Sequence, residues 1–180
     1  MSRIGKKPIE IPEGLVVEIK DGMIKVKGPK GELNWSYPDG IKVSVNGSSI
    51  SVERAGDTKV EKSLHGLTRS LISNMITGVS QGYQKVLDIV GVGYKTQLVG
   101  NKLVFALGYS HPVEFQLPEG IKASVDAKQI QITLMGIDKQ KLGQVAASLK
   151  ALRFPDAYKG KGIRYSGERL KLKVGKAGKK

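Results

Sequence analysis

Apolar and polar residues alternate over several short stretches in the first third of the chain, a pattern typical of half-buried strands. Asp21-Gly22 and Asn46-Gly47 lie between such stretches, and both dipeptides are strong signals for the tight turn of a β-hairpin. The pattern therefore predicts a sheet built from antiparallel hairpins. The expected strands are 15–19, 23–27, 32–37, 41–45 and 50–52.

The hydrophobic period changes after residue 57, where apolar residues begin to recur every three or four positions. This spacing draws one apolar stripe along a helix. Thr58 is the expected N-cap, with Glu61 completing a capping box, and Gly78 is expected to end the helix. The stripe consists of Val60, Leu64, Leu67, Leu71, Met75 and Val79.

The second half repeats this order of strands followed by one helix. We expect the helix to begin after Asp138, a suitable N-cap, and to stop before Pro155. Its buried stripe should contain Leu142, Val145 or Ala146, Leu149 and Leu152. The expected strands are 85–90, 94–99, 102–107, 113–117, 121–125 and 129–134.

The two halves are also similar in residue identity. Without a gap, 38–59 matches 118–139 at 9 of 22 positions, which places Ile50 opposite Ile130 and Gly56 opposite Gly136. Two copies of one small unit are the simplest explanation. We therefore expect an α+β protein with two tandem duplicated domains, each an antiparallel β-sheet with one helix packed on one face. The expected domains are 1–82 and 83–180.

Charge distinguishes the two copies. The chain carries 30 Lys and Arg against 16 Asp and Glu, a net charge of +14. Residues 1–82 hold 12 basic and 9 acidic residues, whereas residues 150–180 hold 11 basic and 2 acidic ones. Such asymmetry favours a polyanionic partner at the C-terminal end, and leaves the weakly charged N-terminal domain as a surface for protein contacts. For 166–180, a basic tail without a specific partner stays an alternative.

The segment 155–165 concentrates residue types that bind nucleic acid. Gly160 and Gly162 are expected to let the backbone approach a polyanion and donate N–H groups, since no Cβ is in the way. Lysine and arginine neutralise phosphates, and a tyrosine stacks on a base or hydrogen-bonds a sugar. The candidate binding residues are Tyr158, Lys159, Gly160, Lys161, Gly162, Arg164, Arg169, Lys171, Lys173, Lys176 and Lys179.

Other kinds of site find little support. The chain has no cysteine and only two histidines, which excludes thiolate chemistry and a His-rich metal site. Gly91-Val92-Gly93 fails the dinucleotide fingerprint, because Thr96 stands where a third glycine is needed and a strand follows. We expect no enzyme activity, no cofactor, no small-molecule substrate and no membrane span. Both histidines, His65 and His111, are expected to be structural, and the charges of Arg54, Lys59, Lys62 and Arg69 to be solvated.

Several segments together resemble the bacterial large-subunit ribosomal protein six family: 2–9, 91–95, the Pro-Asp-Ala-Tyr-Lys-Gly-Lys-Gly-Ile run at 155–163, and 175–180. The likeness covers the whole chain and its duplication. It departs from the family at 169–173, where adjacent arginines are expected and Arg-Leu-Lys-Leu-Lys stands instead.

This resemblance implies a structural protein of the cytoplasmic ribosome, with the candidate residues above binding large-subunit rRNA. It implies contact through the C-terminal domain, near the sarcin–ricin loop and the stalk base, beside neighbouring ribosomal proteins and translation factors. From the residues alone, a sequence-independent nucleic-acid chaperone remains open. A binder of anionic membranes is disfavoured, because the C-terminal segment contains glycine and proline instead of a basic amphipathic helix.

Overall fold

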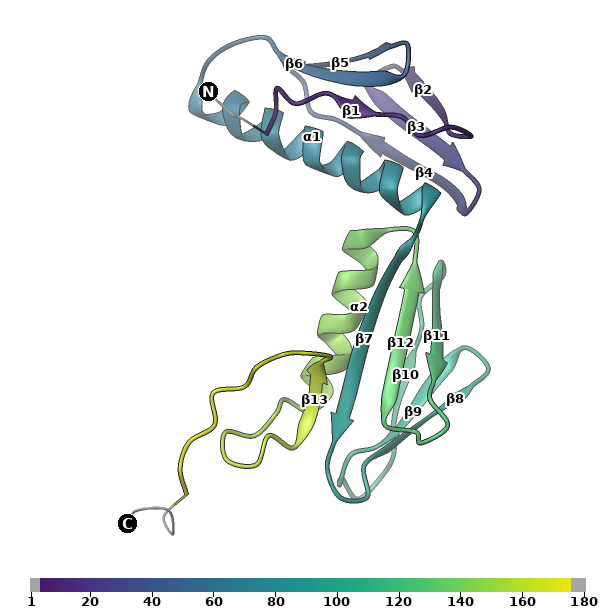
Figure 1. Cartoon of the computed structure of the whole chain (residues 1–180), viewed down its shortest axis with the longest axis vertical. Helices are drawn as coiled ribbons and strands as arrows, with labels where there is room; N and C mark the ends of the chain where they lie inside the picture. Colours follow the sequence, from purple (N-terminus) through teal and green to yellow (C-terminus); the bar gives the residue numbers. More distant parts are fainter. Residues whose placement is uncertain (1–3, 176–180) are drawn as a thin grey trace. The chain divides into compact units, whose positions relative to one another are not determined.

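The computed structural model describes residues 4–175 and divides the chain into two compact units. The first comprises Met1–Tyr83 with Ile137–Lys139, and the second comprises Gln84–Gly136 with Gln140–Lys180. Figure 1 shows both units.

The first unit consists of two three-stranded antiparallel sheets and one long helix, α1 (Figure 1). Alternating side chains of strands β3 and β6, among them Ile24 and Ile50, are fully buried. Ile72 and Val79 of α1 complete this core. The sheets have the strand orders β2-β3-β4 and β1-β6-β5. The elements are β1 (Ile9–Glu10), β2 (Val16–Lys20), β3 (Met23–Gly28), β4 (Gly31–Ser36), β5 (Ile41–Asn46), β6 (Ser49–Arg54) and α1 (Lys59–Ser80).

The expected capping box of α1 is confirmed, but its expected end is wrong. The Thr58 side chain accepts the N–H of Glu61, and the Glu61 carboxylate accepts the N–H of Thr58. Gly78 is a buried residue inside the helix. Gly82 is the glycine that ends the helix, and it donates its N–H to Thr77 O. Its φ is +76°, the left-handed conformation that the residue after a C-cap often takes and that glycine adopts without strain.

The second half has the same plan with one more strand. Its sheets have the orders β10-β9-β8 and β11-β12-β7-β13. Phe105, Leu134 and Leu149 lie in its core and are fully buried. The elements are β7 (Tyr83–Val90), β8 (Lys95–Val99), β9 (Lys102–Ala106), β10 (Val113–Gln116), β11 (Ile121–Val125), β12 (Gln131–Gly136), α2 (Lys139–Leu152) and β13 (Gly162–Tyr165).

The α+β class and its duplication are confirmed, with two small sheets in each half where we expected one. The ungapped match of 38–59 with 118–139 is wrong within the β11–β12 hairpin. Ile50 pairs with Val45 and is fully buried, and the residue that pairs with Val125 is Ile132, also fully buried. Ile130 is 42% exposed, because the second hairpin has the longer turn. Ile132 is therefore the counterpart of Ile50.

The extra strand, β13, was not expected, since its residues were assigned to a loop. It adds to the free edge of β7, with Ile163 opposite Ile89 and Arg164 opposite Asp88. Ile163 is fully buried. The basic segment is therefore held to the body of the unit by core packing on its C-terminal side and by α2 on its N-terminal side.

Candidate nucleic-acid interface

The chain between α2 and β13 forms a short closed loop. Asp156 N–H donates to Lys161 O over 3.0 Å, and Gly160 N–H donates to Asp156 O over 3.2 Å. At the base of the loop, Ile163 N–H donates to Arg153 O over 2.8 Å. These bonds join the two ends of the loop, so the intervening residues project as one shaped unit.

The carboxylate of Asp156 organises the inside of this loop. Its Oδ1 accepts the backbone N–H groups of Tyr158 and Lys159 over 2.8 and 2.6 Å, and its Oδ2 accepts that of Lys161 over 2.8 Å. The N–H groups of Lys159, Lys161 and Tyr158 lower the pKa of this carboxyl from 3.8 to about 2. The stabilisation is therefore present above about pH 4 and is lost as the pH falls through about 2.

This geometry changes the role expected of the two candidate glycines. Gly160 and Gly162 are buried, and five N–H groups of the loop are bonded within the protein, those of Asp156, Tyr158, Lys159, Gly160 and Lys161. Gly160 has φ +67°, and a Cβ there would lie 3.2 Å from Leu170 Cδ1. A Cβ on Gly162 would lie 2.6 Å from the carbonyl oxygen of Phe154. The glycines therefore serve the internal packing of the loop, and side chains form its outer surface.

Three of the candidate side chains project from the loop. Tyr158 is 61% exposed and Lys159 is exposed, while Lys161 is half-buried. Neither lysine forms an ion pair among residues 4–175. Because the one acid of the loop faces its own backbone, these charges remain available to a ligand.

Arg164 is more constrained than the loop lysines. It is half-buried on β13, opposite Asp88 in the neighbouring strand. Its charge also contributes to the lowered pKa of Glu168. Arg164 is thus partly compensated by nearby acids, which reduces what it can offer to a phosphate.

The chain after β13 packs back onto the loop. Lys173 N–H donates to Ala157 O over 2.7 Å, and Leu170 and Leu172 are the nearest side chains to Gly160. The alternating leucines thus face the loop. The basic residues that alternate with them, Arg169, Lys171 and Lys173, are exposed. Two further candidates, Lys176 and Lys179, lie outside the described residues.

Basic residues from other elements join this region, and the sequence reasoning missed them. Lys85 of β7 and Lys150 of α2 lie over the ring of Tyr165 at 5.1 and 5.0 Å. Lys150 also forms an ion pair with Glu168 over 2.6 Å, with both side chains largely buried. The hydrogen bond from Lys150, followed by that from Tyr165 N–H, lowers the pKa of Glu168. Tyr165 is therefore a packing residue.

The Gly91-Val92-Gly93 motif has a packing role. A Cβ on Gly91 would lie 2.5 Å from the ring of Tyr94, and one on Gly108 would lie 3.1 Å from it. The glycines therefore make room for an aromatic ring, in agreement with the failed dinucleotide fingerprint.

Arg153, which lies just before the 156–161 loop in sequence, is placed over the ring of Tyr109 at 4.9 Å.

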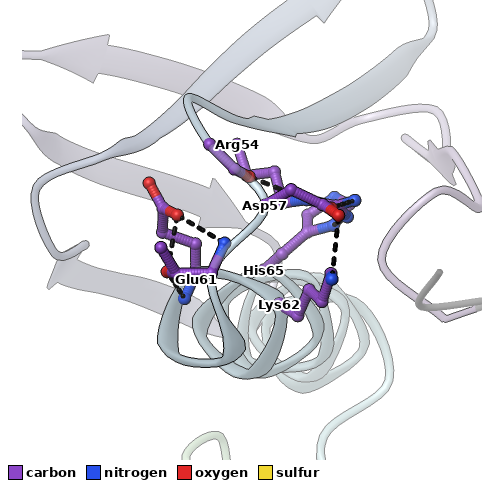
Figure 2. Close-up of polar contacts among 7 residues, drawn as sticks. Arg54, Asp57, Glu61, Lys62 and His65 are labelled. Carbon is purple, nitrogen blue, oxygen red and sulfur yellow. Dashed lines mark hydrogen bonds and ion pairs between the residues drawn. The ribbon is translucent and has the colours of Figure 1, made fainter.

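A second polar cluster lies at the start of α1 (Figure 2). The buried His65 donates from Nε2 to Val52 O over 2.8 Å, and its Nδ1 lies 3.3 Å from the guanidinium of Arg54. Arg54 also bonds Asp57 over 2.6 Å, and Lys62 bonds the same carboxylate over 2.8 Å. Lys62 and then Arg54 lower the pKa of Asp57.

This cluster confirms the structural role expected of His65. It contradicts the expectation that Arg54 is solvated, since the Arg54 side chain is 14% exposed. Arg69 is half-buried and donates to Lys7 O over 3.1 Å, so it is not simply solvated either. A hollow of about 380 Å³ lies beside His65 and is lined by Lys6, Val52, Glu53, Arg54, Gly56, Asp57 and His65.

Among residues 4–175, no group of three or more His, Cys, Asp or Glu is placed to hold a metal ion. Within the same part of the chain, no helix has both the length and the apolar character needed to span a membrane.

Comparison with known proteins shows which family the chain resembles. The sequence model of the family described as ribosomal protein L6 matches residues 11–82 and again residues 90–166, which agrees with the duplication. Among curated proteins, the chain is 60% identical over 180 residues to the large ribosomal subunit protein uL6 of Thermodesulfovibrio yellowstonii. It is 53% identical over 180 residues to that of Syntrophomonas wolfei, and both matches cover 100% of each chain. The chain therefore belongs to the ribosomal protein L6 family.

Proposed function

We propose that this protein binds large-subunit rRNA mainly through its C-terminal domain, 83–180, and that the basic segment around the 156–161 loop makes the principal contact. Family membership already makes the chain a structural constituent of the large ribosomal subunit in the cytoplasm, and no enzyme. The proposal adds the surface that is used and the way in which it binds.

The observation that carries this proposal is the arrangement of charge in the segment. Residues 155–175 contain six basic and two acidic residues. Asp156 faces its own backbone and Glu168 is paired with Lys150, so neither acid neutralises the loop lysines. Lys159 and Lys161 would meet phosphates and Tyr158 a base or a sugar, with Arg169, Lys171 and Lys173 extending the cationic surface.

Recognition of this kind depends on shape and backbone. Side chains read little sequence from double-helical RNA, whose major groove is deep and narrow. We place the contact near the sarcin–ricin loop and the stalk base, where the protein would support the rRNA and the region at which translation factors dock. The weakly charged N-terminal domain, 1–82, would then be available to neighbouring ribosomal proteins.

The test is replacement of the two loop lysines by Lys159→Ala and Lys161→Ala in the full chain. Each lysine that neutralises a phosphate steepens the fall of affinity with salt. The double variant should therefore bind an rRNA fragment carrying the sarcin–ricin hairpin more weakly, and its plot of log affinity against log salt should flatten by about 1 unit per lysine. Binding is measured by fluorescence anisotropy across a potassium chloride series.

Lys20→Ala with Lys42→Ala is the matched control, since both are exposed lysines of the first unit and the net charge changes equally. The control should keep the original slope. If the two double variants had the same slope and affinity, the loop would not be the contact.

A further inference from the structure

Asp156 is the residue of the basic segment whose charge runs against the proposed function. A carboxylate placed among phosphate-binding lysines repels a polyanion, so charge alone makes it unfavourable for binding. Its oxygens, however, accept three backbone N–H groups from the residues whose side chains project from the loop, Tyr158, Lys159 and Lys161. The repulsion and the hydrogen bonding thus have opposite effects on RNA affinity.

We propose that Asp156 is a positioning residue for RNA binding, which holds the backbone of Tyr158, Lys159 and Lys161 in the conformation that meets the RNA. This inference rests on the proposed function of the loop. A carboxylate with two oxygens suits the task, because Oδ1 accepts two N–H groups while Oδ2 accepts the third. It remains charged at neutral pH, since the same hydrogen bonds stabilise the ionised form.

The three hydrogen bonds indicate that positioning of the loop by Asp156 raises RNA affinity more than the negative charge of Asp156 lowers it. Without the carboxylate, three N–H groups would turn to water and the loop would sample other conformations, which it would have to lose on binding. The remaining loop bonds, such as that from Gly160 N–H to Asp156 O, do not involve the side chain. The main-chain frame should therefore persist while the lysine side chains lose their fixed positions.

Two replacements separate positioning from charge. Asp156→Ala removes the charge and all three acceptors, while Asp156→Asn removes the same charge but keeps one oxygen that can accept the N–H groups of Tyr158 and Lys159. The probe is the rRNA fragment with the sarcin–ricin hairpin. We expect Asp156→Ala to weaken binding by about tenfold, corresponding to about 1.4 kcal/mol, with Asp156→Asn between it and the wild type.

Glu119→Gln is the control, because it removes one charge from an exposed acid in a turn of the same unit. Its affinity should equal or exceed that of the wild type. If Asp156→Ala and Asp156→Asn both bound the RNA more tightly than the wild type, repulsion by the carboxylate would outweigh its positioning effect and the proposal would be wrong.

A double-mutant cycle distinguishes positioning from general destabilisation. In a chain that already carries Tyr158→Ala, Lys159→Ala and Lys161→Ala, adding Asp156→Ala should change affinity by less than twofold, since the three side chains that it positions are gone. An unchanged tenfold loss in that background would contradict the proposal. If the lysine replacements alone had no effect, the proposed function itself would fail; if they weakened binding and Asp156→Ala did not, only this inference would fail.

The free protein offers a readout without RNA. In ¹H–¹⁵N spectra the amide protons of Tyr158, Lys159 and Lys161 should shift and exchange faster in Asp156→Ala, while that of Ile163 in β13 stays protected. Unchanged exchange at the three loop amides would mean that the carboxylate does not hold the loop.

Discussion

Gly162 shows how closely the backbone at the start of β13 approaches the end of α2. Its φ is +149°, and a Cβ at this position would lie 2.6 Å from Phe154 O and 2.7 Å from Arg153 O. Both neighbours are backbone atoms, which cannot move aside as a flexible side chain can. The glycine is therefore required by the fold of the segment and lies beneath the surface that we assign to RNA.

We predict that Gly162→Ala destabilises the protein by about 1–3 kcal/mol, because the backbone must shift or accept an unfavourable conformation. The measurement is the midpoint of urea unfolding for the full chain. Gly167→Ala is the control, since Gly167 also has a positive φ, +79°, but open space around it. An equal, small loss for both would show that conformation alone matters and that the close approach does not.

At the scale of single residues, the sequence shows which residue types are present but seldom which atoms they contact. The residue types of the loop predicted an RNA surface, and the exposure of Tyr158 and Lys159 fits that surface. The roles of Gly160 and Gly162 could not be predicted, because they depend on where Leu170, Leu172 and the carbonyls of the two residues after α2 lie. Asp156 carried a signal that was missed, since an aspartate often accepts the N–H two residues on.

The elements were predictable wherever a periodic pattern was long enough to be seen. The helical period and the Thr58–Glu61 capping box marked α1, and Asp-Gly and Asn-Gly marked two hairpins. The expected stripe was wrong in part, because Val60 and Leu67 are exposed and Ile72 and Ile76 are buried instead. The short strands β1 and β13 had no such pattern. β13 is a strand because Ile163 meets Ile89 of β7 across the sheet, a pairing between distant residues that no local signal in a Gly- and Lys-rich segment reveals.

We predict that Ile163→Ala destabilises the protein by about 2–5 kcal/mol, as expected for the loss of a fully buried isoleucine. The neighbouring Arg164→Ala, on the half-buried side of the same strand, should cost under about 1 kcal/mol. Thermal unfolding followed by circular dichroism gives both values. Equal costs would mean that β13 does not belong to the core of its unit.

At the scale of the whole molecule, duplication produced two similar units with different charge. Both halves have a helix behind antiparallel hairpins, and Lys59 and Lys139, which begin the two helices, differ by 80 in residue number. The second half adds β13 and the basic residues on both sides of it, in the 156–161 loop and in 169–173. In the first half, the corresponding residues 76–82 comprise the end of α1 and the two residues after it, and they carry no charge. Repeat, charge and motif together therefore predicted the fold class and the family, whereas the surface that we propose for RNA depends on an addition to only one copy.

The most direct test of the account is a comparison of two RNAs of equal length, measured with the full chain at physiological salt. One is the large-subunit fragment carrying the sarcin–ricin hairpin and its neighbouring helices, and the other is an unrelated folded RNA. We predict at least tenfold tighter binding to the ribosomal fragment, and loss of most of that preference with Lys159→Ala and Lys161→Ala. Equal affinity for both RNAs, falling together as salt rises, would contradict specific rRNA recognition by this surface and would favour sequence-independent binding of polyanions.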